Sequence, residues 1–177
     1  MAHVMLDLET LGNGSNAVII SIGAVEFIPA TSQIGRKFEV LIDPQSCVDA
    51  GLKIDASTVM WWMEQDQAAR DQFKRSKFLL QEALKSFSGF LTNVGTSVNV
   101  WGNGATFDNV ILSNAYLAAK IERPWKYYND MCFRTMRKMY PKVHQDQIGV
   151  AHRAVDDAEY QARLLMKILV QAGIANV

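Results

Sequence analysis

Cysteine is scarce in this sequence of 177 residues. Its two cysteines, Cys47 and Cys132, lie far apart and in no C-x-x-C spacing, which argues against a disulfide framework or a zinc knuckle. No apolar run approaches the ~20 residues that span a bilayer, and the first residues show no basic segment followed by an apolar one. We therefore expect a soluble protein of the reducing cytoplasm with no membrane partner.

An excess of charge is absent as well. The 18 basic residues match the 18 acidic ones, so no overall field attracts polyanions, and any affinity for nucleic acid must come from a local patch. The sequence does contain enough apolar material, 49% of its residues, to bury one core. We expect a single domain over residues 1–177.

The hydrophobic pattern predicts strands first and strand–helix units later, which is typical of an α/β fold. Strands are expected within residues 3–14, 17–29, 36–43 and 97–103, the first three as a meander of neighbours. Helices are expected over 57–70, 79–95 and 107–120 and from about Arg153 onward. Ser57 and Thr106 are the expected N-caps of the first and third helices, and Gly95 closes the second.

Two acids interrupt the first strand, where Asp7 and Glu9 stand among apolar neighbours. Alternate side chains of a strand share a face, so these two carboxylates point the same way. Neighbouring buried carboxylates repel each other unless a cation lies between them. The first 35 residues contain no Lys or Arg. A divalent metal ion is therefore the cation to test.

Two further acids fall at predicted helix starts. Asp108 follows the turn WGNGATF, and Asp157 lies in the stretch HRAVDDAEY beside His152. An Asp in a first helical turn is also stabilised by the helix dipole alone, so position by itself leaves a purely structural role open.

Together these residues resemble a known family. DLET at 7–10, N-x-x-x-x-D at 103–108 and H-x-x-x-x-D-A at 152–158 resemble, in order and separation, the three motifs of the DnaQ-like exonuclease superfamily in its DEDDh branch. The stretch STVMWWMEQDQAAR and the short chain are most similar to a small subfamily of phage exonuclease A-like and bacterial exoribonuclease-like proteins. The resemblance implies a ribonuclease H-like fold, a mixed five-stranded sheet flanked by helices.

The resemblance also implies a role for each of these side chains. Two divalent ions, Mg²⁺ or Mn²⁺, would be bound by four carboxylates, those of Asp7, Glu9, Asp108 and Asp157. Such ions prefer oxygen ligands, and two of them can activate water and stabilise a leaving oxygen in phosphodiester hydrolysis. His152 would be the general base, because an imidazole with an unperturbed pKa of ~6.5 accepts a proton at neutral pH. Family spacing selects Asp157 over Asp156.

Substrate contacts are expected on both sides of these acids. In related enzymes the segment after the first motif cradles the terminal nucleotide, which points to Thr10, Leu11 and Gly12. Aromatic side chains can stack on unpaired bases, although at least one of the adjacent tryptophans is expected in the core. The remaining candidates are Trp61, Trp62, Asn103, Phe107 and the basic residues Lys120, Arg123, Lys126, Arg134, Arg137, Lys138 and Lys142, which form either a phosphate track or a solvated face.

The predicted function is metal-dependent hydrolysis of single-stranded DNA or RNA from a free 3′ end to nucleoside monophosphates. The sequence does not decide between DNA and RNA, because no residue identifiably reads the 2′-hydroxyl. A non-catalytic nucleic-acid-binding module of the same fold is the alternative. The resemblance to RNase T suggests a homodimer.

Overall fold

The structure is a computed structural model that describes residues 2–75 and 77–174. In this part of the chain a five-stranded sheet has the order β3-β2-β1-β4-β5. The strands are β1 (Ala2–Thr10), β2 (Ile19–Ile28), β3 (Gln33–Leu41), β4 (Val98–Gly102) and β5 (Asp130–Cys132). The pairs β1–β2 and β2–β3 are antiparallel, as the meander predicted, whereas the pairs β1–β4 and β4–β5 are parallel. The mixed five-stranded sheet expected from the sequence is confirmed.

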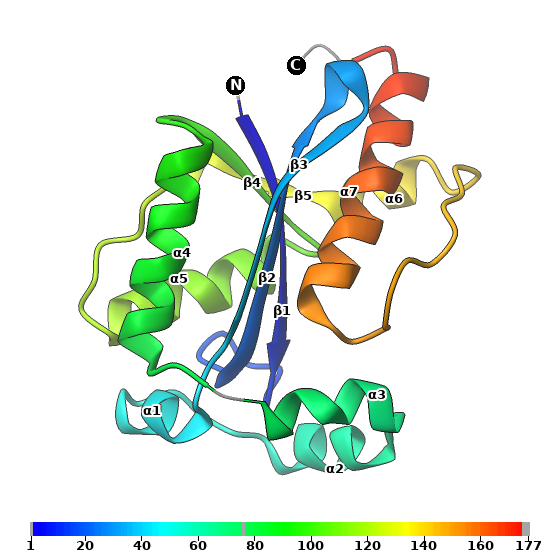
Figure 1. The fold of residues 1–177 in the computed structure, drawn as a ribbon. Coiled ribbons are helices and arrows are strands. Elements are labelled where there is room, and N and C mark those ends of the chain that lie inside the picture. The colour runs from blue at the N-terminus through cyan, green and yellow to red at the C-terminus, as the bar shows by residue number, and fades with distance from the viewer. Residues whose placement is uncertain (1, 76, 175–177) are drawn as a thin grey trace.

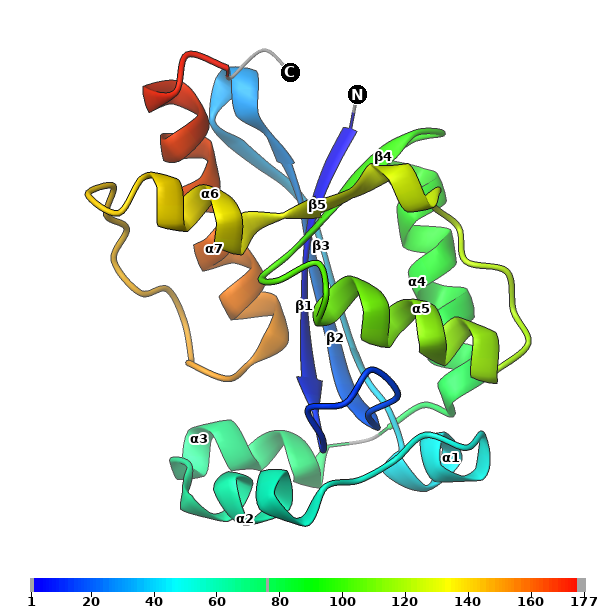
Figure 2. The same cartoon turned by 180° about the vertical axis from the view of Figure 1, so that it is seen from behind.

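Helices cover both faces and one end of this sheet (Figures 1 and 2). One face carries α4 (Leu80–Val94) and α5 (Asp108–Ala118), and the other carries α6 (Phe133–Met139) and α7 (Ala154–Gln171). Across the end where β1 finishes lie α1 (Pro44–Asp49), α2 (Ala56–Glu64) and α3 (Gln67–Arg70). The short 3-10 helices are η1 (Pro29–Thr31), η2 (Asp71–Lys74) and η3 (Tyr127–Asn129). No helix within the described residues is long and apolar enough to cross a membrane.

Alternation along β1 sends its side chains into two cores. Val4 and Leu6 pack in the core that includes α4 and α5, whereas Met5 packs in the core built on α7. Asp7 and Glu9 continue the odd-numbered set toward the α7 side. Since α7 runs back along the sheet, its N-terminal turn lies at the carboxyl end of β1 (Figure 1). The end of β1 and the start of α7 therefore lie next to each other.

The start of α2 differs from the prediction. The helix begins at Ala56, so that Asp55 and not Ser57 occupies the N-cap position. The Asp55 carboxylate accepts no bond from the helix and instead accepts the backbone N–H of Asn13 at 2.9 Å. A tertiary contact has thus replaced the local cap, which the sequence pattern alone cannot reveal.

The start of α5 differs in the same way. Phe107, not Thr106, is the N-cap residue, and no side chain caps the helix. The carbonyl of Gly104 accepts the N–H groups of Phe107 and Asp108 at 2.7 and 3.2 Å. Gly104 has a φ of +107°, a conformation that glycine adopts without a Cβ clash. This tight turn fixes Asp108 as the first residue of the helix.

We predict that Gly23→Ala destabilises the protein and disturbs the site. Gly23 pairs with Asp7, and a Cβ there would lie 2.1 Å from the carbonyl carbon of Ala154, so the start of α7 would have to move. Overpacking of this kind costs about 1–3 kcal/mol. Urea unfolding measures the cost, and Gly89→Ala in α4, whose Cβ would meet nothing within 4 Å, is the control. Equal stabilities of the two variants would contradict this account of the packing.

Candidate active site

Asp7 and Glu9 reach the site from the last residues of β1. Asp7 Oδ1 accepts a hydrogen bond from Nε2 of Gln161 on α7 at 2.7 Å. Immediately after Glu9 the register with β2 shifts, because Glu9 lies opposite Ser21 and Thr10 lies opposite Ile19. Bulges of this type turn the chain and are frequent beside active sites.

Asp108 approaches the same two acids from the turn after β4. Its side chain is 2% exposed, and Oδ1 accepts the backbone N–H of Leu8 at 3.2 Å. Leu8 stands between Asp7 and Glu9, so this bond holds the third carboxylate against the strand that carries the first two. Asp108 Oδ2 is buried and has no hydrogen-bond partner among the described residues.

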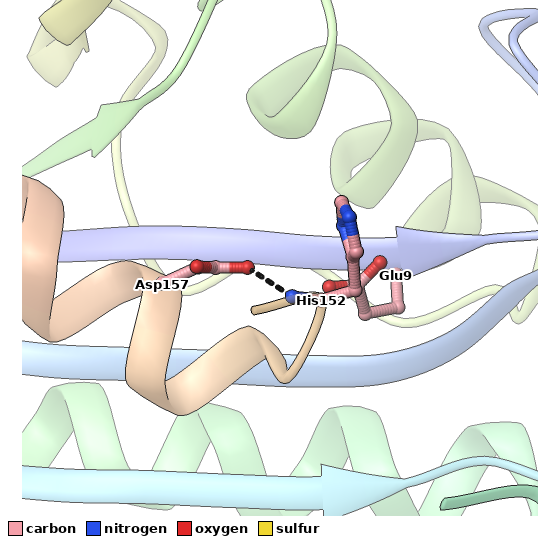
Figure 3. Close-up of side chains that lie close together, drawn as sticks. All are labelled: Glu9, His152 and Asp157. Carbon is pink, nitrogen blue, oxygen red and sulfur yellow. Dashed lines mark hydrogen bonds between the residues drawn. The ribbon is translucent and has the colours of Figure 1, made fainter. Parts of the chain in front are cut away.

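His152 and Asp157 complete the cluster from the start of α7. Ligand atoms of Glu9, His152 and Asp157 all lie within 4.8 Å of one another (Figure 3). The backbone N–H of His152 donates to Asp157 Oδ2 at 2.8 Å. His152 has a φ of +63°, which is uncommon for a residue other than glycine and typical of strained functional positions.

The loop that carries His152 is held from three directions. Nε2 of the buried Gln72 donates to the carbonyl of His152 at 3.0 Å. The next residue, Arg153, donates from Nε and Nη2 to the two carboxylate oxygens of Glu39 at 2.8 and 2.9 Å. The ring of Trp61 lies edge-on to the imidazole, with 5.0 Å between centroids. These contacts fix a backbone that would otherwise be free to relax.

Asp156 has a different position from its neighbour. Its carboxylate accepts the N–H of Val150 at 2.9 Å and lies 3.7 Å from the guanidinium of Arg153. A Cβ on Gly149, which has a φ of +65°, would lie 2.4 Å from the Asp156 carboxyl carbon. Asp156 thus closes the loop before α7, while Asp157 faces Glu9.

The electrostatics of the cluster favour protonation in the absence of a cation. Burial raises the pKa of Glu9 to about 8, and the charges of Asp157 and Asp108 add to the effect. Burial also raises the pKa of Asp108 to about 7, although hydrogen bonds from backbone N–H groups oppose it. The Asp7 residue keeps some exposed surface, but its carboxylate is removed from water. This loss of solvation, and then the charges of Asp108, Glu9 and Asp157, raise its pKa well above the usual range. The pKa of Asp157 is likewise raised by burial.

A cavity of about 420 Å³ opens beside these acids. Trp61, which is 41% exposed, contributes to its wall, whereas Trp62 is 3% exposed and donates from Nε1 to the carbonyl of Thr10 at 2.9 Å. The expectation that one tryptophan lies in the core is therefore confirmed for Trp62. The cavity is lined by Leu8, Glu9, Thr10, Asn13, Ser57, Thr58, Trp61, Trp62 and Phe107.

Three predicted substrate contacts lie outside this lining. Leu11 is buried in the core with α4 and α5, and Gly12 lies so close to Asp55 that a Cβ would be 2.9 Å from Oδ2. Asn103 lines a separate cavity behind the turn after β4. Their contacts with substrate stay predictions.

The basic segment divides into two groups. Arg123 lies 3.5 Å from Asp130, donates to Ser113 at 2.8 Å and covers the ring of Trp125, so it is part of the fold. Arg134, Arg137 and Lys138 instead line the cavity that contains Asn103. Sequence proximity alone could not separate these groups.

Sequence reasoning missed the supporting amides. Gln161 had a detectable signal, because it follows Asp157 by four residues and so lies on the same helical face. Gln72 had none, since its bond to His152 spans 80 residues and depends on how η2 packs.

Three acidic segments and a histidine thus meet at the carboxyl end of β1, in the arrangement that the motifs of a 3′-to-5′ exonuclease predicted. The chain belongs to the family described as "3'-5' exoribonuclease Rv2179c-like domain", whose model matches residues 2–169. No curated protein sequence matches the chain.

Solved structures share this fold at low sequence identity. The nuclease domain of 3'hExo, a DEDDh family member bound to rAMP, is 17% identical with a TM-score of 0.65, over 98% of this chain and 94% of that one. A 3'-exonuclease that recognises the histone mRNA stem-loop has a TM-score of 0.66 at 17% identity, over 98% and 83%. Exonuclease X in complex with 5' overhanging duplex DNA has a TM-score of 0.60 at 18% identity, over 97% and 93%.

The raised pKa values predict how the metal-free protein responds to pH. Between about pH 4, where free carboxyls titrate, and about pH 8 for Glu9, the folded state holds protons that the unfolded state has released. These groups therefore make the protein less stable as pH rises through this window. Asp7→Asn removes one charge, so in EDTA it should raise the melting temperature at pH 8 and flatten the pH dependence.

The exposed Asp146, changed to Asn, is the matched control and should melt like the parent. Added Mn²⁺ should raise the parent's melting temperature more than that of Asp7→Asn. If Asp7→Asn melts below the parent in EDTA at pH 8, the repulsion argued here is not present.

Proposed function

We propose that this exonuclease hydrolyses single-stranded nucleic acid from a free 3′ end to nucleoside monophosphates, with two Mg²⁺ or Mn²⁺ ions and RNA as the preferred substrate. The observation that carries the proposal is the cluster of Asp7, Glu9, Asp108 and Asp157, in which burial first, and for Asp7 and Glu9 also the neighbouring negative charges, raises the pKa values. The exoribonuclease description of the family supports RNA. DNA is the second candidate, because one structural neighbour is a complex with DNA.

The residues fit divalent ions. All four acids offer carboxylate oxygens, the ligands that Mg²⁺ and Mn²⁺ prefer. Asp108 Oδ2 is a buried acceptor with no partner among the described residues, as expected of an atom reserved for a cation. When bound, the ions would lower the pKa of the attacking water and stabilise charge on the leaving oxygen.

The chain's own side chains would then divide the remaining work. His152 accepts the proton of the attacking water, and the bonds from its backbone to Asp157 and Gln72 keep the imidazole near Glu9. The 420 Å³ cavity holds the terminal nucleotide, with Trp61 and Phe107 as the aromatic surfaces for its base.

Three further properties stay predictions. One domain over the whole sequence is supported by the family match to residues 2–169. A homodimer follows from the resemblance to RNase T, and light scattering in solution tests it. A cytoplasmic location follows from the sequence alone.

His152→Ala should lower kcat by about 10²–10⁴, the usual effect of losing a general base. Calorimetric titration with Mn²⁺ should give the parental affinity, since four carboxylates remain. A control change, Gln81→Ala at an exposed position of α4 that lines none of the cavities described here, should leave both quantities as in the parent. Weaker Mn²⁺ binding in His152→Ala would make His152 a ligand and remove it as the base.

Linear single strands should be degraded and circular ones should not, because we propose that the cavity beside Glu9 holds a 3′-terminal nucleotide, which a circle lacks. A strand blocked by a 3′-terminal phosphate should be cut more slowly than one with a free hydroxyl. Gel analysis of RNA and DNA strands that carry one internal label, in linear and in circular form, measures these rates and the sugar preference together. Cleavage of circles at the linear rate would identify an endonuclease, and binding with no metal-dependent turnover would favour the non-catalytic alternative.

A further inference from the structure

We propose that a second cavity, of about 620 Å³ between α6, α7 and residues 141–145, binds the phosphodiester groups that precede the scissile bond. This inference rests on the proposed function and identifies where the substrate strand leaves the metal site. Asn103, Arg134, Arg137, Lys138 and Tyr160 are among its lining residues, and we call it the basic cavity.

The charge of the basic cavity suits a polyanion. Three cationic side chains line it, and none of its described lining residues is acidic. Two other cavities mix the signs: the one beside Arg153 also contains Asp71, and the one beside Arg163 also contains Glu159. Within the described residues, Arg137 and Lys138 have no acidic group within 4.0 Å. Their charges are therefore available to a ligand.

A structural explanation exists for part of this charge. Arg137 and Lys138 occupy the last turn of α6, where cations interact favourably with the helix dipole. That explanation does not extend to Arg134, which lies in the first turn of the same helix, where a positive charge is unfavourable. Arg134 is instead held by the carbonyl of Asn103, and its charge opposes the rise that burial causes in the pKa of Asp108. Arg137 and Lys138 are therefore the cations of this cavity that are left for an external anion.

Arg134 connects the basic cavity to the active site. Its guanidinium donates to the carbonyl of Asn103, and it lies so close to Gly104 that a Cβ there would be 2.8 Å from Cζ. The carbonyl of Gly104 in turn accepts the N–H of Asp108, the first residue of α5. The turn 103–107 therefore has a metal-site acid on one side and a cation of the basic cavity on the other.

The same turn separates two cavities. Phe107 lines the cavity assigned to the terminal nucleotide, and Asn103 lines the basic cavity. Figure 2 shows this turn reaching from the end of β4 toward the start of α6. A strand whose 3′ end lies beside Trp61 thus passes the acids at Asp108 and meets cations immediately beyond them. These cations offset the repulsion between the strand and the carboxylates.

The experiment compares two double variants that remove the same charge. Arg137→Ala with Lys138→Ala empties the basic cavity of two cations and leaves Arg134 beside Asp108 untouched. Lys77→Ala with Lys85→Ala is the control, because these two exposed lysines line none of the cavities described above. Both are assayed on a long single strand and on the p-nitrophenyl ester of a nucleoside 5′-monophosphate, which has no preceding phosphates.

The ratio of kcat/KM for the strand to kcat/KM for the ester should fall in the first variant and stay parental in the control. The slope of log affinity against log salt for the strand should become less negative by about 1.4, or 0.7 for each lost phosphate contact. A charge-retaining exchange, Arg137→Lys with Lys138→Arg, should restore both quantities and excludes a folding defect as the cause.

The possible results separate the inference from the function on which it rests. If the two alanine variants have equal ratios and equal salt slopes, the basic cavity is not a phosphate site. The same conclusion follows if the charge-retaining exchange behaves like the alanine variant of Arg137 and Lys138. Neither result would contradict the exonuclease activity. A parent protein that turns over neither the strand nor the ester would instead overturn the proposed function.

Discussion

The burial of four carboxylates beside one another is the constraint on which the rest of the structure depends. Asp7, Glu9, Asp108 and Asp157 come from three segments separated by about 100 and 50 residues, and the fold brings their charges together at the end of β1. A protein selected only for stability would neutralise such a cluster. The four acids nevertheless lie together among buried residues. This indicates that bound cations supply the positive charge that balances them.

Much of the surrounding packing serves to hold these acids where they repel each other. The N–H of Leu8 fixes Asp108, the amide of Gln161 fixes Asp7, and the backbone of His152 fixes Asp157. Gly23 lets α7 approach β2 closely enough for the last of these. The positive φ of His152 is a second source of destabilisation. The hydrogen bond from Gln72 of η2, and the bond of the next residue, Arg153, to Glu39 of β3, offset it. Strain and repulsion concentrated in one place are typical of a site that trades stability for function.

The sequence predicted those parts of the structure that follow from short-range pattern. Alternation along the first strand placed Asp7 and Glu9 on one face, and the motif spacing placed Asp108 and Asp157 at helix starts, as the structure has them. The caps at Ser57 and Thr106 were wrong, because Asp55 bonds to a distant loop and a glycine turn replaces a side-chain cap.

The parts that could not be predicted are tertiary. The three-residue strand β5 and the short helices α1 and α6 are too brief to have a recognisable period. The different positions of Arg123, bound to Asp130, and Arg137, beside an open cavity, depend on neighbours far along the chain. The contact between Gln72 and the His152 loop has the same origin. The sequence motifs were enough to predict the four acids of the candidate site. The residues that hold these acids in place, and the cavities beside them, could be found only from the folded structure.

The central claim is that divalent cations are held by this carboxylate cluster, and anomalous X-ray scattering from crystals grown with Mn²⁺ tests it most directly. The account predicts anomalous peaks between Asp7, Glu9, Asp108 and Asp157, and their loss in crystals of Asp7→Asn prepared identically. Well-ordered carboxylates with no manganese between them, or manganese bound only elsewhere on the molecule, would contradict it.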